Sequence, residues 1–197
     1  MPTSRSTAKS SRPLTFTEQA RRAQLIQVTI DLVAEHGYGG TSLARIAESA
    51  GITKAAVLYH FPSKEAVVQA AHQHVLDALV EAVTTAVEAS TPVDGPAAYI
   101  RSMIAYLRDN PRHTRVIIEA MTETGDRPNP ATRWSPLADL LTTARKARRL
   151  KPHQDPRTLA IIIGGAIDAI VVERLTDPAY DTTSAAETLI TLIQQAH

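Results

Sequence analysis

The stretch TSLARIAESAGITKAAVLYHFPSKEA, residues 41–66, decides how the first third of the chain folds. Thr41 or Ser42 can cap a first helix, in which apolar residues recur at helical spacing before Gly51 ends it. Thr53 can cap a second helix, and the proline nine residues later prevents that helix from continuing. Two short helices joined at a glycine have the layout of a helix-turn-helix.

A longer helix before this stretch completes the predicted unit. Thr15 and Glu18 have the spacing of a capping box, and apolar residues follow at helical intervals as far as Gly37. We therefore expect a helix over Phe16–His36. The apolar residues expected to form a core with it are Leu43, Ile46, Ala47, Ile52, Val57 and Phe61.

The pattern stays helical after this unit. Breaks rich in Pro and Gly separate six further expected helices, and no segment alternates like a strand. Their expected ranges are Ser63 to about Ser90, Ala97–Asn110, Pro111 to about Glu123, Trp134–Leu150, Pro156–Thr176, and Thr183 or Ser184 onward. The predicted fold is all-α with about nine helices. We expect a disordered basic arm (1–14), an N-terminal three-helix helix-turn-helix domain (15–62) and a C-terminal helical ligand-binding and dimerisation domain (63–197).

Composition narrows the functional classes. The 197 residues are 44% hydrophobic and 21% charged, which is ordinary for a globular protein. The chain has no cysteine, so it has no thiol nucleophile, disulfide or cysteine metal site. Residues 1–16 lack the apolar segment of a secretory signal, and the most apolar stretch, Leu159–Val172, is too short to span a membrane. We expect a soluble, cytoplasmic protein.

Charge is distributed unevenly along the chain. The net charge is +1, yet residues 1–64 hold eight Lys or Arg and only four Asp or Glu. A basic first third suggests a polyanionic partner for that part alone, although an ordinary solvated surface would look the same. Arg5, Lys9 and Arg12 of the arm could reach the minor groove of DNA or remain idle.

Motifs of common enzymes are not found. The chain has no nucleophile elbow, phosphate-cradling loop or HExxH sequence, and the glycine-rich residues 37–40 lack the strand that a dinucleotide-binding loop needs. His72 and His74 are two residues apart on a predicted helix, so they cannot chelate a metal as an i, i+4 pair does. We expect a protein that is not an enzyme, with no catalytic residue, cofactor or metal site.

Residues 41–66 resemble the DNA-binding domain of the TetR family of transcriptional regulators. The resemblance extends without gaps over about residues 16–68, including Ala34–Tyr38, while the remaining chain resembles the family only in architecture. Ala55 departs from the pattern, because many members have glycine there. The resemblance implies a bacterial, dimeric regulator that reads operator DNA with the second helix of the helix-turn-helix.

The resemblance also implies DNA contacts for nine residues. Some would face bases or nearby phosphates, two would contact the backbone through polar tips, and others would bind phosphates at helix N-termini. These three groups are Thr53, Lys54, Ala55 and Ala56; Tyr59 and His60; and Thr41, Ser42 and Lys64. Capping by Thr53, packing of Tyr59, a helix-end role for His60 and idle surface lysines are the structural alternatives.

The middle helices would enclose a small ligand. Their aromatic and Met side chains suit a lipophilic compound, although each alone is more often plain core. The candidates are Tyr99, Met103, Tyr106, Ile117, Met121 and Trp134. Glu119 and Asp168 are carboxylates among apolar residues, which is costly unless they are paired. They could meet a cationic or hydrogen-bonding ligand, or form internal salt bridges with Arg115 or Arg174.

The last two helices would pair with a second copy in a four-helix bundle, as the resemblance implies. The helix from Pro156 is apolar almost all round, although a central buried helix would look the same. A dimer would set two recognition helices about 34 Å apart on a palindromic operator. Ligand binding would shift the fourth helix and release a repressor from DNA. A ligand-independent or architectural DNA-binding protein is the alternative.

Overall fold

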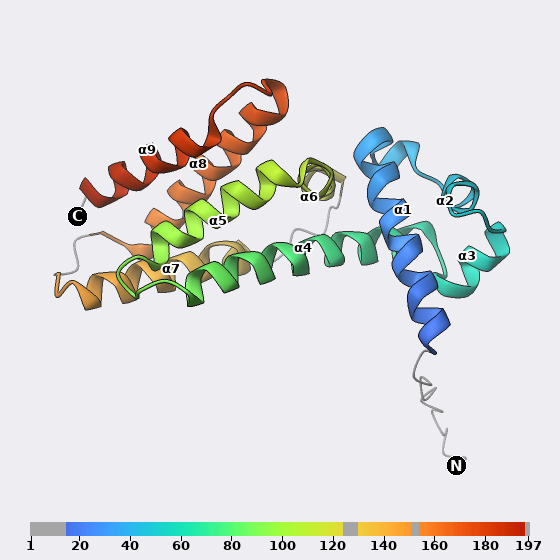
Figure 1. Cartoon of the computed structure of the whole chain (residues 1–197), viewed down its shortest axis with the longest axis horizontal. Coiled ribbons are helices and arrows are strands. Elements are labelled where there is room, and N and C mark those ends of the chain that lie inside the picture. Colours follow the sequence, from blue (N-terminus) through green and yellow to red (C-terminus); the bar gives the residue numbers. More distant parts are fainter. Residues whose placement is uncertain (1–14, 124–129, 151–153, 196–197) are drawn as a thin grey trace, which may run out of the picture.

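The computed structural model describes residues 15–123, 130–150 and 154–195, which excludes the predicted basic arm. Within these ranges the chain forms nine helices and no strand, as predicted (Figure 1). The helices are α1 (Phe16–Gly40), α2 (Leu43–Ser49), α3 (Lys54–His60), α4 (Lys64–Glu88), α5 (Gly95–Asp109), α6 (Pro111–Glu123), α7 (Pro130–Ala147), α8 (Pro156–Thr176) and α9 (Thr182–Gln195). Within the described ranges, every helix is too short or too polar to cross a lipid bilayer.

Side-chain caps fix where the first helices begin. Thr15 and Glu18 form the predicted capping box at the start of α1. Ser42, rather than Thr41, caps α2, and Thr53 caps α3 as predicted. Each cap accepts a hydrogen bond from a backbone amide that has no partner inside its own helix, so these short helices have defined starts.

The predicted apolar residues of the helix-turn-helix share one core. Ile46, Val57 and Phe61 are almost completely buried in it, while Leu43 and Ile52 are partly buried at its edge. Leu25 of α1 and Val67 of α4 complete the core. Because the first turn of α4 packs in this core, the division expected between residues 62 and 63 remains a prediction.

A backbone break interrupts α1 where its end was expected. Gly37 has φ 69° and ψ 176°, outside the helical region, and helical backbone resumes at Tyr38. Such a positive φ is strained for residues with a Cβ, which explains why a glycine occupies this position. The break turns the chain toward α2.

The C-terminal helices pack around α5. Figure 1 shows α4 and α7 on one side of α5, α8 and α9 on the other, and α6 next to α1. The core joins buried side chains of α5, α7, α8 and α9, among them Ile100, Leu137, Ile163 and Ile190. Long helix α4 contacts α1 near its beginning and α5 further along, so it connects the helix-turn-helix to the remaining bundle.

Apolar residues of α4 recur at helical spacing and predict one buried stripe, which the structure bears out only in part. The residues of this predicted stripe are Val68, Ala71, Val75, Leu79, Ala82 and Ala86. The buried residues are instead spaced by four throughout: Val67, Ala71, Val75, Leu79 and Val83. A four-residue spacing winds slowly around a helix of 3.6 residues per turn. The buried line therefore rotates as the packing partner changes from α1 to α5.

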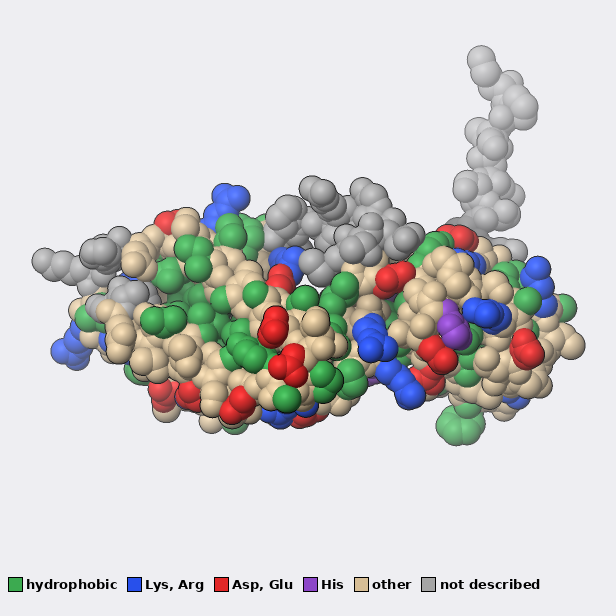
Figure 2. All heavy atoms as spheres, turned by 90° about the horizontal axis from the view of Figure 1, so that it is seen from above, with side chains coloured by type: hydrophobic (Ala, Val, Ile, Leu, Met, Phe, Trp, Pro, Cys, Tyr) green, Lys and Arg blue, Asp and Glu red, His purple; other side chains and the backbone are tan. Residues whose placement is uncertain are grey.

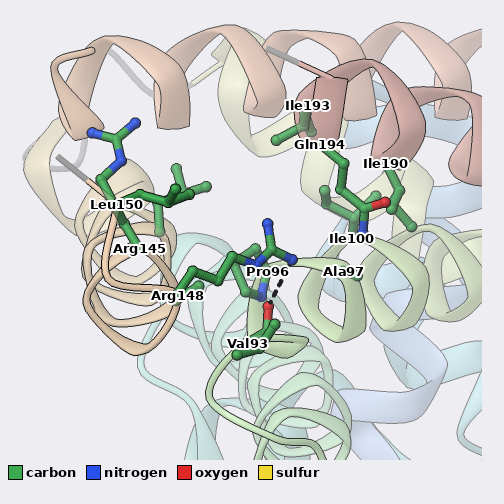
Figure 3. Close-up of a pocket in the computed structure, with 12 residues that line it drawn as sticks. Val93, Pro96, Ala97, Ile100, Arg145, Arg148, Leu150, Ile190, Ile193 and Gln194 are labelled. Carbon is green, nitrogen blue, oxygen red and sulfur yellow. Dashed lines mark hydrogen bonds between the residues drawn. The ribbon is translucent and has the colours of Figure 1, made fainter. Parts of the chain in front are cut away.

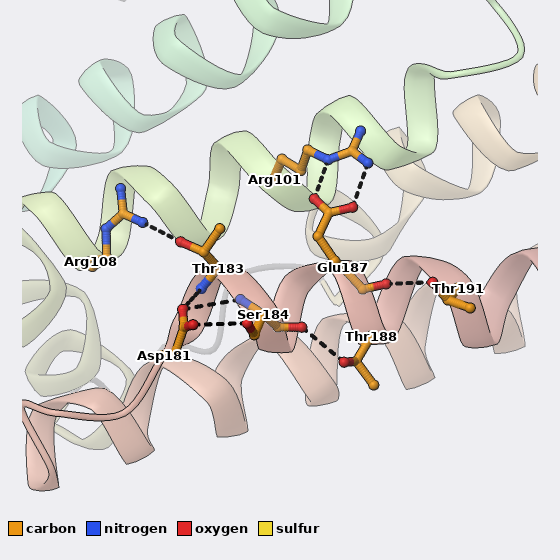
Figure 4. A network of polar contacts seen from close by, with 8 residues as sticks. All are labelled: Arg101, Arg108, Asp181, Thr183, Ser184, Glu187, Thr188 and Thr191. Atoms are coloured by element: carbon orange, nitrogen blue, oxygen red, sulfur yellow. Dashed lines mark hydrogen bonds and ion pairs between the residues drawn. The ribbon is translucent and has the colours of Figure 1, made fainter.

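Three helices begin earlier than predicted, and the first is α5, which starts at Gly95 rather than at Ala97. α7 starts at Pro130, which suits a first helical position, rather than at Trp134. α9 starts at Thr182, because Asp181 accepts hydrogen bonds from the Thr183 and Ser184 amides at 2.9 and 3.1 Å (Figure 4). An aspartate is a strong N-cap, so it fixes the helix start one or two residues before the hydroxyl residues that we had expected to cap it.

Gly51 supplies a test of the turn between α2 and α3. Its φ is +66°, whereas Gly39 has helical backbone, and at neither position would a Cβ meet an atom within 4 Å. Gly51→Ala should lower the free energy of unfolding by about 1–2 kcal/mol through strain alone. Gly39→Ala, the matched control, should be neutral or stabilise by up to about 1 kcal/mol. Equal effects in urea denaturation would contradict the assigned turn.

Candidate nucleic-acid interface

A tight turn holds α3 against α2. The amide of Gly51 donates to the Glu48 carbonyl at 3.1 Å, and the Ile52 amide donates to the Ala47 carbonyl at 3.0 Å. Val57 anchors the inner side of α3 in the core with no exposed surface. A helix fixed at its start, turn and inner face can present its opposite face rigidly.

The outer face of α3 carries small and polar side chains. Lys54 and Ala55 are exposed and Ala56 is half-buried. The Thr53 hydroxyl accepts a hydrogen bond from the Ala56 amide at 3.2 Å, so its predicted capping role is present. In the described part of the chain, Lys54 makes no hydrogen bond or ion pair. Its ammonium group is therefore available to an external partner.

The end of α3 exposes two aromatic rings. Tyr59 is 72% exposed and its hydroxyl donates to Glu18 Oε1 at 2.9 Å. His60 lies edge-on to Tyr59, with 5.1 Å between ring centroids. The Tyr59 hydroxyl is thus engaged by a carboxylate of α1, and the expected backbone contacts of both residues remain predictions.

The three residues predicted at other helix N-termini are placed differently from one another. Ser42 is exposed and caps α2. Thr41 is only 2% exposed, because its hydroxyl donates to the Gly37 carbonyl at 2.9 Å. Lys64 Nζ donates to the Tyr38 carbonyl at 2.6 Å and lies 3.7 Å from the centroid of the Tyr38 ring. Thr41 and Lys64 therefore stabilise the α1–α2 corner, and their expected phosphate contacts remain predictions.

Arg22 supports the recognition helix in a way the sequence did not reveal. Its guanidinium donates to the His60 carbonyl and lies 4.0 Å from the centroid of the Phe61 ring. A cation at a helix C-terminus interacts favourably with the helix dipole. From the sequence alone, Arg22 is expected to be a solvated side chain. The partner is 38 residues away, so no local pattern could have identified it.

Helix α6 contacts α1 through polar side chains. Glu119 Oε1 accepts a hydrogen bond from the Tyr38 amide at 2.6 Å. Arg115 Nη1 donates to the Ala34 carbonyl at 3.4 Å, and Arg112 forms an ion pair with Asp31 at 3.3 Å. A Cβ on Gly37 would lie 2.8 Å from Glu119 Oε1, so the glycine also makes room for this carboxylate. Glu119 thus binds the backbone of α1 at its break.

Asp168 has an internal partner, but it is neither of the two that we considered. Its carboxylate pairs with Arg133 on α7, rather than with Arg115 or Arg174. Both charges of this pair affect the pKa of the Tyr99 hydroxyl. Burial raises the pKa of Tyr99, Arg133 opposes the rise and Asp168 adds to it.

The other ligand candidates pack with neighbouring helices. Tyr99, Met103 and Trp134 pack against the α5–α9 core, and Ile117 packs against the core shared by α1, α4 and α6. Tyr106 and His113 share a hydrogen bond of 2.7 Å between Oη and Nδ1. Burial raises the pKa of Tyr106 and lowers that of His113. The Met121 side chain lies outside the described residues.

Two described cavities lie elsewhere in the bundle. One is lined by residues of α5, α7 and α9, where Arg148 donates to the Val93 carbonyl at 3.5 Å (Figure 3). The other lies where α5 meets α6 and α8 meets α9. None of the seven predicted ligand residues whose side chains are described lines either cavity, and the role of all eight in binding stays a prediction.

Apolar side chains are exposed on α8 and α9. Ile161, Ile162 and Val172 of α8 and Leu192 of α9 are 50–63% exposed. The view onto these helices in Figure 2 shows hydrophobic side chains gathered over this part of the surface. Exposed apolar groups that cluster in this way are typical of an interaction surface.

Residues 25–71, which include the whole helix-turn-helix, match the family model described as bacterial regulatory proteins, tetR family. The N-terminal domain belongs to the TetR family. This TetR-family domain comprises the capped α2, the Gly51 turn and α3, so the resemblance seen in the sequence is confirmed.

The match to a curated relative goes beyond residues 25–71 but covers only part of this chain. The HTH-type transcriptional regulator RutR of Escherichia coli K12 is 32% identical over 117 residues, 59% of this chain and 53% of RutR. The chain thus spans about half the length of this curated relative. A TetR-like transcriptional regulator from Rhodococcus sp. RHA1 has a TM-score of 0.74 at 22% identity, covering 94% of this chain and 98% of its own.

AibR, solved in complex with isovaleryl coenzyme A and operator DNA, has a TM-score of 0.72 at 20% identity. The match covers 87% of this chain and 97% of AibR. At this level of identity, the two structural likenesses establish the shared helical fold.

Glu119 supplies a test of the contact between α6 and the TetR-family domain. Glu119→Ala leaves the Tyr38 amide without its charged acceptor and should lower the free energy of unfolding by about 1.5–3 kcal/mol. Glu119→Gln keeps an acceptor and should cost less. The control, Arg112→Gln, breaks an exposed ion pair and should cost less than about 1 kcal/mol. Equal costs for Glu119→Ala and the control in urea denaturation would show that the bond contributes no more than a surface pair.

Proposed function

We propose that this protein is a transcriptional regulator of the TetR type that binds a palindromic operator as a homodimer and is released by a small ligand. The observation that carries the proposal is the TetR-family helix-turn-helix with the polar face of α3 exposed. Release from DNA by ligand makes it a repressor. The function implies a cytoplasmic protein that is not an enzyme.

The start and outer face of α3 form the proposed base-reading surface. Lys54 is free to contact DNA, and Ala55 and Ala56 allow close approach to thymine methyl groups. Tyr59 and His60 would contact the sugar-phosphate backbone at the other end of the helix. Ser42 would bind a phosphate at the start of α2, where amides and the helix dipole favour an anion. Thr41 and Lys64 contribute by holding the corner beneath this surface.

Selection of bound sequences from random duplex DNA tests the proposal directly. The selected sequences should share two inverted half-sites whose centres lie about one helical turn apart. An architectural DNA-binding protein, the second candidate, would enrich no motif and would bind scrambled competitor equally well. The absence of any enriched motif would overturn the proposed function.

Lys54 should act through phosphate or base contacts that depend on salt. Lys54→Ala should weaken binding to the selected operator, and the loss of one cation per subunit should reduce the slope of log K against log salt by about 1–2 per dimer. Fluorescence anisotropy over a salt series measures this slope. Lys146→Ala on α7 removes the same charge from an exposed site far along the chain, so it is the control. An unchanged slope in Lys54→Ala would remove this residue from the interface.

The exposed apolar face of α8 and α9 supports the homodimer. Ile161, Ile162 and Val172 lie on α8 next to the small residues Gly165 and Ala169, which permit close helix approach. A second copy of the chain brings the same face and can bury it by twofold symmetry. Pairing in this way leaves the helix-turn-helix of each subunit uncovered for DNA.

Ile162 supplies the test of this dimer surface. Ile162→Glu places a charge in the proposed interface and should convert the dimer to a monomer at micromolar concentration in sedimentation velocity. Val80→Glu is the matched control, because Val80 on α4 is 60% exposed and Ile162 63%. A dimer that survives Ile162→Glu would place the interface elsewhere.

The proposed ligand is small and lipophilic, and it binds within the C-terminal helices. A positive charge on it is not required, because Glu119 accepts from the Tyr38 amide and Asp168 pairs with Arg133. Ligand binding would weaken operator binding by changing how α4 and α6 hold the TetR-family domain. Such coupling requires that the ligand and the operator prefer different arrangements of the same helices.

A further inference from the structure

A cavity of about 240 Å³ lies where α5 meets α6 and where α8 meets α9. Its apolar wall comes from α5 and α8 and consists of Ile104, Leu107, Val171 and Leu175. Three arginines and one threonine also line it, and no acidic residue does among those that the structure describes. The polar lining residues are Arg108, Arg115, Arg174 and Thr182.

The three guanidinium groups differ in how far they are already engaged. Arg174 makes no hydrogen bond or ion pair within the described residues. Arg115 has one long bond, 3.4 Å, to the Ala34 carbonyl of α1. Arg108 is held by Asp109 at 2.7 Å and donates to the Thr183 hydroxyl at 2.9 Å (Figure 4). Arg115 and Arg174 therefore contribute positive charge that no carboxylate in the cavity wall neutralises.

Nearby carboxylates are committed to other partners. Asp109 binds Arg108, and Asp181 caps α9 by accepting from two backbone amides and from the Ser184 hydroxyl. These hydrogen bonds hold the pKa values of both acids below their ordinary values. The largest contribution comes from Arg108 for Asp109 and from the Ser184 amide for Asp181. Both acids are ionised at neutral pH, and the cavity retains an excess of positive charge.

Thr182 gives a second, independent indication of a polar occupant. It is 2% exposed, and its hydroxyl has no hydrogen-bond partner in the described part of the chain. Buried hydroxyl groups almost always have a partner, because an unpaired one loses its bonds to water without replacement. Thr182 lines the cavity, so an occupant that brings an acceptor to this hydroxyl would supply the missing bond.

We propose that this cavity binds the anionic head group of a small organic molecule, a carboxylate or a phosphate ester, with a short alkyl chain against the α5–α8 wall. Arg174 and Arg115 would bind the anion through charged hydrogen bonds, and the Thr182 hydroxyl would donate a third. The cavity is smaller than the sites of drug-sized ligands, which favours a short alkyl chain.

Binding in this cavity goes beyond the proposed function and does not depend on operator recognition. Its consequence for DNA does rest on the proposed function. Arg115 lies one helical turn before Glu119, and its bond to Ala34 helps to hold α6 against α1. An anion that captures Arg115 competes with this bond and so alters the contact between α6 and the helix-turn-helix.

The test compares three ligands that share an eight-carbon chain: octanoate, octyl phosphate and uncharged 1-octanol. Isothermal titration of the full chain without DNA should show at least one anion binding about tenfold or more tightly than octanol. Arg174→Gln and Thr182→Val should each weaken binding of the anion by about five- to tenfold and leave the affinity for octanol unchanged. The better of the two anions identifies the head group.

Arg149→Gln is the matched control, because it removes the same charge from an exposed arginine that lines neither cavity. Thermal melts should show that Thr182→Val folds normally, since valine replaces a hydroxyl that has no partner. Equal affinity for anions and octanol, or equal loss in Arg149→Gln and Arg174→Gln, would overturn the proposal. A chain that binds the anion but selects no operator would refute the proposed function and leave this site intact.

Discussion

The backbone of Tyr38 joins the two parts of the molecule. Its amide donates to Glu119 of α6, and the carbonyl of the same residue accepts from Lys64 at the start of α4. The break at Gly37 frees the Tyr38 amide from the helical pattern, while the Tyr38 carbonyl also accepts from the Thr41 amide at 3.2 Å. Two helices of the C-terminal bundle therefore hold the corner from which α2 and the recognition helix follow.

This arrangement explains how a signal in the bundle could reach DNA. Thr41 follows the corner directly, and its side chain is buried against Gly37, so α2 cannot move independently of Tyr38. α4 and α6 approach the corner from different directions. We expect a change in either helix to alter the support of α3, although α3 lines neither cavity.

The helix-turn-helix could be predicted because its determinants are local. Caps at Ser42 and Thr53, a glycine in the turn and apolar residues at helical spacing all lie within one stretch of sequence. The rest of the site depends on contacts between distant residues. Tyr38 and Glu119 are 81 residues apart, and Arg133 and Asp168 are 35 apart.

The sequence therefore could not show which distant residues pair with one another. Glu119 and Asp168 were singled out as carboxylates that need a partner, but neither the Tyr38 amide nor Arg133 was among the partners considered. The stripe of α4 failed for a related reason: periodicity predicts one buried face, whereas a helix that changes packing partner buries a winding line. Local rules identify the elements, and tertiary packing decides which of their faces and charges meet.

The energies of the α6–α1 contacts are suited to a switch. Coupling between a ligand and DNA typically amounts to about 1–3 kcal/mol. An exposed pair such as Arg112 and Asp31 contributes about 0–1 kcal/mol, whereas a charged acceptor on a backbone amide contributes about 1.5–3 kcal/mol. The free energy of the Glu119 bond alone is therefore comparable to this coupling free energy. Val116 and Ile117 also pack α6 against α1 in a shared apolar core, so the Glu119 bond is one adjustable contact within a helix pair that is otherwise held by packing.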